Sequence, residues 1–402
     1  MSRDASSVQV TSDTVHRWCE RSTIPGRHPE LSDAAAVAIA TGHLDASARA
    51  IVLARMRAGL PIPSSSQMLP GAREFAELRR LQRTVATLDE QADAPVTPSV
   101  VAAVIRARRN SVARKLDDAR RTLVSGKGVF ATGVRAIRRE RREGTHLEAV
   151  DRERLFIGLT YTPTPDVGGY VRRIGNAALE RVAGAIENAA AKAGKDSGRR
   201  WFAEIAGDVE GAAPGSDSRF IDGYETMLFA AGSFYDRVLR CPAWHSEHFT
   251  LQRGQVDLNA ELAEIAADVI ALRAIRVDLD ASRRSAGFDD SLDGHIARRE
   301  ESLRPVWREL VDRVAALATV AEVVESAAAE LRVLEEYAHT ATIDDRIDEL
   351  VGRAGSREVS ADNTRRLTEQ VRAGEENLRI YRDVLQGNIL RLSAGSRPWS
   401  GE

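Results

Sequence analysis

Basic residues gather in one segment of this chain of 402 residues. Between Arg106 and Arg142 the sequence holds thirteen lysines and arginines but only three acidic residues, an excess of ten positive charges. The whole chain has a formal charge of −2, so the remaining residues together carry a net charge of −12. A run of Lys and Arg can neutralise phosphates and release their counterions, which is the chemistry of binding to nucleic acid or to an anionic surface.

The residues expected to make such contacts lie towards both ends of the segment. The predicted polyanion-binding residues are Arg106, Arg108, Arg109, Arg135, Arg138, Arg139, Arg141 and Arg142. Phe130 is the single aromatic residue of the segment, so the sequence offers little for stacking on bases. The alternative interpretation is a solvated face, or a face that pairs with acidic helices of the same chain.

A second constellation lies in residues 289–300, which read DDSLDGHIARRE. This segment resembles the calcium-binding loop of EF-hand proteins, with Gly294 at the position of the sharp turn. The resemblance implies calcium as a cofactor, held by Asp289, Ser291, Asp293, His295 (through its backbone carbonyl) and Glu300. Ala297 departs from the pattern because it leaves the ninth position without a side-chain ligand. The alternative is a polar turn whose acidic residues cap the next helix.

Catalytic motifs do not emerge from the sequence. Residues 125–128, SGKG, contain the lysine of a phosphate-binding loop, but Arg121 stands where the first glycine belongs, and Gly128 replaces the magnesium-binding Ser or Thr. No dinucleotide fingerprint, nucleophile elbow or H-E-x-x-H motif is present. The sequence therefore supports neither an enzyme nor a small-molecule substrate.

The elements that must position these residues are predicted to be helices. Aromatic residues make up only 5% of the chain, which favours helix-on-helix packing over a sheet. In the last 150 residues, apolar side chains recur with the alternating 3-and-4 spacing of a heptad. The first stripe is Leu258, Leu262, Ile265, Val269, Leu272 and Leu279. The second is Leu303, Trp307, Leu310, Val314, Leu317, Ala321, Val324, Ala328 and Leu331. The third is Leu378, Tyr381, Leu385 and Leu392.

These stripes predict an all-α fold. We expect an elongated helical bundle that ends in an antiparallel, coiled-coil-like three-helix region, because short connections favour antiparallel neighbours. A parallel coiled coil between chains remains the rival arrangement. The predicted divisions are an N-terminal helical region (1–95), a basic and less regular middle region (96–250) and the C-terminal bundle (251–402).

The two cysteines and the hydropathy pattern predict where the protein works. Cys19 and Cys241 cannot form a disulfide framework, and the sequence shows neither a signal peptide nor a transmembrane segment. We therefore expect a soluble, cytoplasmic protein.

Three functions follow from these features. The first is a non-enzymatic scaffold or assembly protein that acts through protein–protein contacts or self-association, with charges such as Glu325, Arg332 and Glu335 selecting the partner. The second is binding of nucleic acid or an anionic surface through residues 106–142. The third is a calcium-responsive helical protein that uses residues 289–300.

Overall fold

The computed structural model describes residues 10–93, 99–165, 217–286, 290–352, 372, 374, 376–384 and 387. The chain divides into two compact units, each built from separate stretches of sequence. Unit 1 takes the described residues of Met1–Arg17, Thr41–Gly59 and Ala230–Glu402, and unit 2 takes those of Trp18–Ala40 and Leu60–Phe229. The units interleave along the chain, whereas the sequence prediction divides it into three consecutive regions.

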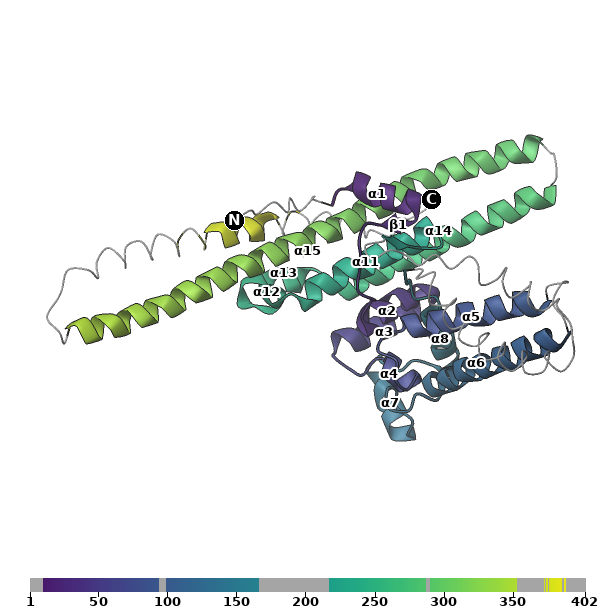
Figure 1. Ribbon diagram of the computed structural model, residues 1–402, viewed down its shortest axis with the longest axis horizontal. Coiled ribbons are helices and arrows are strands. Elements are labelled where there is room, and N and C mark those ends of the chain that lie inside the picture. Colours follow the sequence, from purple (N-terminus) through teal and green to yellow (C-terminus); the bar gives the residue numbers. More distant parts are fainter. Residues whose placement is uncertain are drawn as a thin grey trace, which may run out of the picture. The chain divides into compact units, whose positions relative to one another are not determined.

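Unit 2 carries the basic segment on a small set of helices (Figure 1). Its helices are α2 (Asp33–Ala40), α4 (Ser65–Met68), α5 (Ala76–Asp93), α6 (Ser99–Ser125), α7 (Val134–Arg142), α8 (Ala149–Thr160) and the first part of α11 (Gly223–Arg240). Two short strands, β1 (Thr23–Ile24) and β2 (Ser218–Arg219), pair antiparallel, with Thr23 opposite Arg219.

Helix α6 shows why these helices pack as they do. Val112, Leu116, Ala119 and Leu123 recur every three or four residues and are all buried, which defines one apolar stripe. Helices α5 and α8 both pack against α6, and α5 lies beside α6 in Figure 1. The packing side of α6 therefore uses its apolar residues and leaves its basic residues on other faces.

Unit 1 is dominated by two long helices. Its elements are most of α1 (Ser12–Arg21), η1 (Thr41–His43), α3 (Ala46–Arg57), the rest of α11, α12 (Pro242–His245), η2 (Glu247–Phe249), α13 (Thr250–Gln255), α14 (Leu258–Ala286) and α15 (Asp290–Gly352). Helices α14 and α15 lie side by side, and α12 also packs on α15 (Figure 1). The two long helices run antiparallel, since Arg283 contacts Asp293 and Glu261 contacts Arg313.

The heptad stripes of α14 and α15 point into the core of this unit. All positions from Leu258 to Leu272 in the first stripe are buried, and so are all those from Leu310 to Ala328 in the second. Leu279, Leu303, Trp307 and Leu331, at the ends of the stripes, are half-buried. Buried apolar side chains at this spacing stabilise the pairing of the two helices.

The third stripe is only partly described. Leu378 is buried and Tyr381 is half-buried, whereas Leu385 and Leu392 lie outside the described residues. A Cβ atom added at Gly374 would lie 2.6 Å from Leu334 Cδ2, so this stretch approaches α15 closely. The helical residues 376–384 lie beside α15 in Figure 1.

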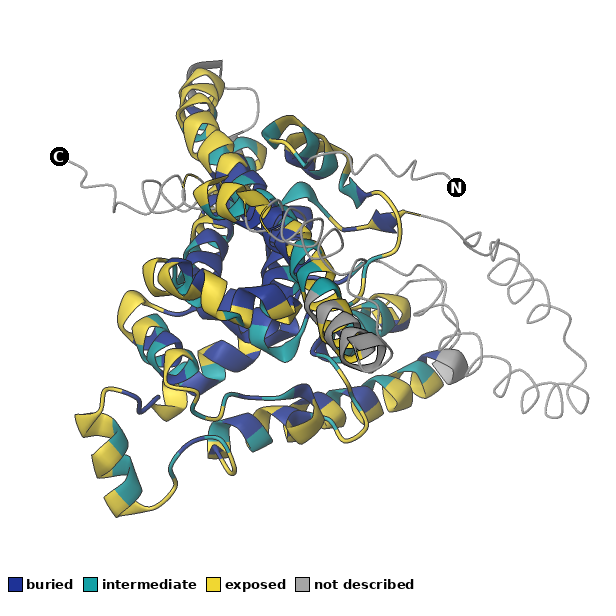
Figure 2. Cartoon of the chain, turned by 90° about the vertical axis from the view of Figure 1, so that its left-hand side faces the viewer, coloured by how far each residue is buried: buried dark blue, intermediate teal, exposed yellow. Residues whose placement is uncertain are grey.

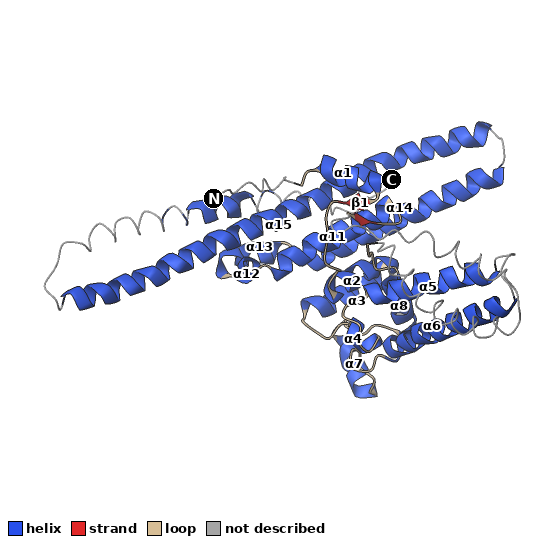
Figure 3. Cartoon of the chain, viewed as in Figure 1, coloured by secondary structure: helices blue, strands red, loops and turns tan. Residues whose placement is uncertain are grey.

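The predicted all-α fold is confirmed. Figure 3 shows helices throughout the described part of the chain, apart from connections and the short strands. The coiled-coil character and the three-helix arrangement stay predictions. Among the described residues, no helix has the combination of length and apolar character needed to cross a bilayer.

Candidate polyanion-binding surface

The basic side chains of the segment point to solvent, although the segment itself packs in unit 2 through its apolar residues. Of its thirteen lysine and arginine side chains, twelve belong to exposed residues, and Arg109 is intermediate. This exposure follows from the amphipathic pattern of α6, whose buried stripe excludes the charged positions.

Four of the thirteen pair with carboxylates of unit 2. Arg109 contacts Asp89 at 2.9 Å, Arg121 contacts Asp118 at 2.7 Å, Arg141 contacts Glu148 at 2.7 Å, and Arg120 pairs with Glu153. Each pair is solvent-accessible, so each contributes about 0–1 kcal/mol to stability. The internal-pairing interpretation applies to these four residues.

The other nine have no carboxylate partner within the described part of the chain. They are Arg106, Arg108, Arg114, Lys115, Lys127, Arg135, Arg138, Arg139 and Arg142. Six of the eight residues predicted to bind a polyanion, including all of those on α7 except Arg141, belong to this group.

Helix α7 arranges four of these cations on one side. We call this side the arginine face, and it consists of Arg135, Arg138, Arg139 and Arg142. The spacing i, i+3, i+4, i+7 places the four side chains within an arc of roughly 100° around the helix axis. None of the α7 residues is buried, and the short helix at the lower left of Figure 2 shows only exposed and intermediate colours.

The opposite side of α7 is attached to the rest of unit 2. Glu140 lies roughly 150° around the helix from the arginine face. Its Oε2 atom lies 3.1 Å from Nδ1 of the buried His146 and accepts a hydrogen bond of 3.3 Å from the Ala131 backbone N–H. These contacts turn the carboxylate side towards unit 2 and the arginine face towards solvent.

The arginine face is costly for an isolated helix. Like charges three and four residues apart destabilise a helix by roughly 0.2–0.5 kcal/mol per pair, and the four arginines form four such pairs. The helix dipole favours Arg139 and Arg142, which lie in the last turn, but not Arg135 in the first. A bound phosphate would relieve this repulsion, since a guanidinium donates two parallel hydrogen bonds to phosphate oxygens.

The one aromatic residue of the segment does not join this surface. Phe130 is buried, and the guanidinium carbon of Arg152 lies 4.4 Å from its ring centroid. The face of the ring is therefore occupied and cannot stack on a nucleobase.

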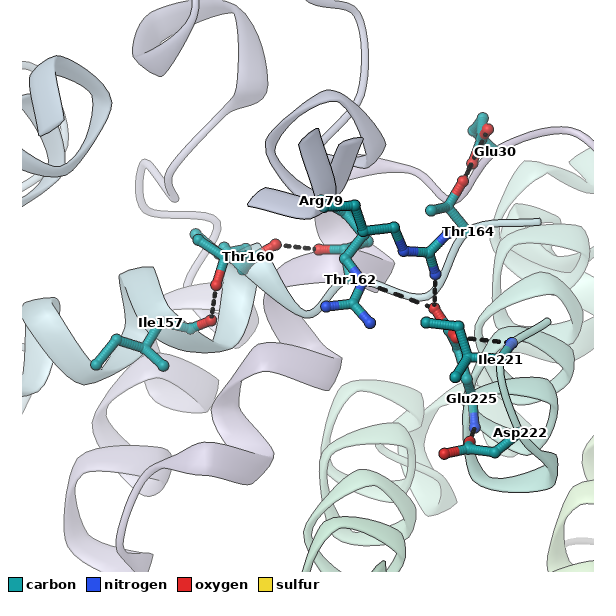
Figure 4. A network of polar contacts seen from close by, with 11 residues as sticks. Glu30, Arg79, Ile157, Thr160, Thr162, Thr164, Ile221, Asp222 and Glu225 are labelled. Carbon is teal, nitrogen blue, oxygen red and sulfur yellow. Dashed lines mark hydrogen bonds and ion pairs between the residues drawn. The ribbon is translucent and has the colours of Figure 1, made fainter. Parts of the chain in front are cut away.

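A buried polar network stabilises the part of unit 2 near α5 and α11 (Figure 4). The Glu225 carboxylate, almost completely buried, lies 2.7 Å from Arg83 and 3.8 Å from Arg79. Asp222 accepts a 2.8 Å hydrogen bond from the Glu225 N–H, and Glu225 accepts one of 3.2 Å from Ile221 N. This reciprocal capping fixes the start of α11.

Glu30, like Glu225, is a buried carboxylate that several polar groups surround. It pairs with Arg80 and accepts a hydrogen bond of 3.0 Å from the Thr164 hydroxyl. Burial raises the pKa of Glu30, and the Arg80 charge and the Thr164 hydrogen bond oppose this shift. The sequence prediction included neither Glu225 nor Glu30, although the D-x-x-E pattern at 222–225 is a recognisable signal for the start of a helix.

Four of the five predicted calcium ligands lie in a helix and not in an EF-hand loop. Asp289 lies outside the described residues, but Ser291, Asp293, His295 and Glu300 all belong to α15, which is helical from Asp290 onwards. An EF-hand loop instead needs a sharp turn at its glycine, so that successive oxygens converge on one ion.

Two acidic residues of this segment contact arginines of α14. Glu300 lies 3.2 Å from both Arg276 and Arg283, and Asp293 lies 3.6 Å from Arg283. The hydrogen bond from Arg283 lowers the pKa of Glu300. Among the described residues, no three His, Cys, Asp or Glu side chains group in a way that could hold a metal ion.

Comparison of the chain with family models, curated proteins and solved structures gives no match.

Proposed function

We propose that this protein binds a polyanion carrying phosphate or sulfate groups through the arginine face of α7, assisted by the exposed cations of α6. The observation that carries the proposal is the set of nine exposed basic residues that have no carboxylate partner among the described residues, four of which share one side of a nine-residue helix. Electrostatic attraction of this kind needs no pocket and no bound cofactor. The proposal assigns no catalytic step.

The chain offers a matched pair of variants for testing this proposal. The face variant replaces Arg135, Arg138, Arg139 and Arg142 with Gln. The control variant replaces four other arginines with Gln, namely those that already have carboxylate partners: Arg109, Arg120, Arg121 and Arg141. Both variants lower the net charge by four, so a difference between them depends on position rather than on total charge.

The experiment is a fluorescence titration of labelled heparin at several salt concentrations. We expect the face variant to weaken binding by roughly tenfold or more, and the control variant to weaken it much less, because its arginines are partly neutralised in the free protein. Equal losses in the two variants, or no binding of heparin by the wild-type protein, would contradict the proposal.

Assembly through helical surfaces is a second candidate. The heptad positions Leu310, Val314 and Leu317 are already buried, and Glu325 already pairs with Arg237 at 2.6 Å. The apolar side chains available for a partner are instead exposed ones in the second half of α14 and the first third of α15, including Ile275, Val277 and Val306. Contacts between copies through these residues would bury them.

Sedimentation velocity tests this second candidate. We expect the wild-type protein to show a concentration-dependent oligomer, and Ile275→Glu with Val306→Glu to shift it to the monomer. A wild-type protein that stays monomeric at high concentration contradicts self-association.

A cytoplasmic location remains part of the proposal, supported by the free thiols of Cys19 and Cys241.

A further inference from the structure

We infer that the polyanion is double-stranded nucleic acid, bound through its sugar–phosphate backbone and independently of base sequence. This inference rests on the proposed function, and it names the ligand of the same arginine face. Three features of unit 2 carry it: the absence of an exposed aromatic residue in the described part of the basic segment, the placement of the apolar side chains of α7, and the spacing of its arginines.

The aromatic content distinguishes duplexes from single strands. Proteins that bind single-stranded nucleic acid gain roughly 1–3 kcal/mol per base by stacking on aromatic side chains. Phe130 is the one aromatic residue between Arg106 and Arg142, and it is buried under Arg152. Binding must therefore come from phosphate contacts, and a duplex presents phosphate charges more densely, about one per 1.7 Å of axis.

The apolar residues of α7 distinguish nucleic acid from a membrane. A helix that binds the bilayer interface exposes a continuous apolar face carrying large side chains. In α7, Val134 is 66% exposed, but Ala136 and Ile137 are only half-exposed and lie towards the Glu140 side. The most exposed side is the arginine face, which has nothing to insert among acyl chains.

The dimensions of the arginine face fit a duplex. From Arg135 to Arg142 the helix rises roughly 10 Å, a length over which a duplex presents about six phosphate charges. The helix with its side chains is about 10–12 Å across, close to the width of the major groove. The four side chains are all guanidinium groups, whose shared chemistry suits repeated phosphates better than a varied row of base edges.

The test compares ligands of different classes on the full chain and the two variants described above. The probes are two labelled DNA duplexes of unrelated sequence and about 20 base pairs, one of their single strands, labelled heparin, and vesicles of phosphatidylcholine mixed with phosphatidylserine. Circular dichroism on each variant verifies that the helices are intact.

We expect both duplexes to bind with the same affinity, at least several-fold tighter than the single strand and tighter than the vesicles. The plot of log affinity against log salt has a negative slope, and its magnitude should decrease by about 3.6 in the face variant. Each lost phosphate contact changes this slope by about 0.9. The control variant should change the slope much less.

The other outcomes reject either the nucleic-acid inference alone or the proposed function as well. Binding to heparin but not to either duplex rejects the nucleic-acid inference and leaves the proposed function standing. Tighter binding to vesicles, tighter binding to the single strand, or a strong preference for one duplex sequence also rejects the inference. Failure of every probe rejects the proposed function and the inference together.

Discussion

The Nε atom of Arg313 in α15 donates a 2.9 Å hydrogen bond to Oε1 of Glu261 in α14, and less than a tenth of either side chain is exposed. Arg313 also contacts Asp268 at 3.1 Å and Glu264 at 3.7 Å. The pair lies among the apolar residues that join the two long helices. This buried pair penalises every other register of the two helices, because a shifted helix would bury the charges of Arg313 and Glu261 unpaired.

Replacing one member of this pair should destabilise unit 1. We expect Arg313→Met to lower the free energy of unfolding by about 3–5 kcal/mol, because Glu261 would be left as a buried charge without its partner. Replacing both Glu261 and Arg313 with Met should restore most of the loss. Chemical denaturation of the two variants provides the measurement. A double variant that is as unstable as the single one would show that the pair stabilises the interface by more than mutual neutralisation.

Gly42 lets η1 pack directly against α14 in unit 1. A Cβ atom at this position would lie 2.9 Å from backbone atoms of Ala266 and Ala267 and 2.8 Å from Ile270 Cδ1. We expect Gly42→Ala to destabilise the protein by about 1–3 kcal/mol, because η1 and α14 would be forced apart. Gly254→Ala is the matched control in α13, where nothing lies within 4 Å of the added atom. Thermal unfolding that affects both variants equally would rule out a steric cause.

A substitution at Gly294 distinguishes a helical conformation of residues 289–300 from an EF-hand loop. It lies inside α15, and a Cβ atom there would meet nothing within 4 Å. We therefore expect Gly294→Ala to stabilise the protein by up to about 1 kcal/mol, the usual gain from replacing glycine in a helix. In an EF-hand loop the same substitution would disrupt the turn and abolish calcium binding. Calorimetric heat with calcium that the wild-type protein gives and the variant loses would favour the loop.

The Cys19 thiol should be unreactive in the folded protein. Burial raises its pKa to about 12, and the negative charge of Glu20 adds to the effect. Thiolate is the reactive form, so in a Cys241→Ala background we expect alkylation at mildly alkaline pH to be roughly a thousandfold slower than in the unfolded chain. Mass spectrometry after timed labelling gives both rates. Similar rates in the folded and unfolded states would contradict the burial of this side chain.

Glu30 should make the stability of unit 2 depend on pH. Its folded pKa is raised, chiefly by burial, so the folded state holds a proton that the unfolded chain releases at lower pH. The stabilisation from this group is complete below the ordinary value of 4.5 and is lost as the pH rises through the raised value. Glu30→Gln cannot titrate, and Arg80 keeps Glu77 as a partner at 3.0 Å.

Urea denaturation of the wild-type protein and Glu30→Gln across the acidic range tests this linkage. We expect the stability of the wild-type protein relative to the variant to decrease with rising pH in the window above 4.5. A difference that stays constant, or that changes in favour of the wild-type protein, would show that Glu30 titrates at or below its ordinary pKa.

The spacing of apolar residues determined a large part of this fold. A helix repeats every 3.6 residues, so a periodic pattern within one segment predicts both the helix and its buried side, as it does for Leu262, Val269, Leu310 and Leu317. The same local reasoning gives the charge excess between Arg106 and Arg142. It did not predict β1 and β2, because two-residue strands that lie nearly 200 residues apart are too short to show a pattern.

Only the tertiary structure decided which charges have partners. Arg313 meets Glu261 across 52 positions and Arg83 meets Glu225 across 142, and no local pattern specifies such pairs. The packing of α6 through Val112 and Leu116, and the attachment of α7 through Glu140, leave Arg135 and its three neighbours without carboxylates within the described residues. Charge is a property of single residues, whereas neutralisation and exposure depend on what the whole fold brings near them.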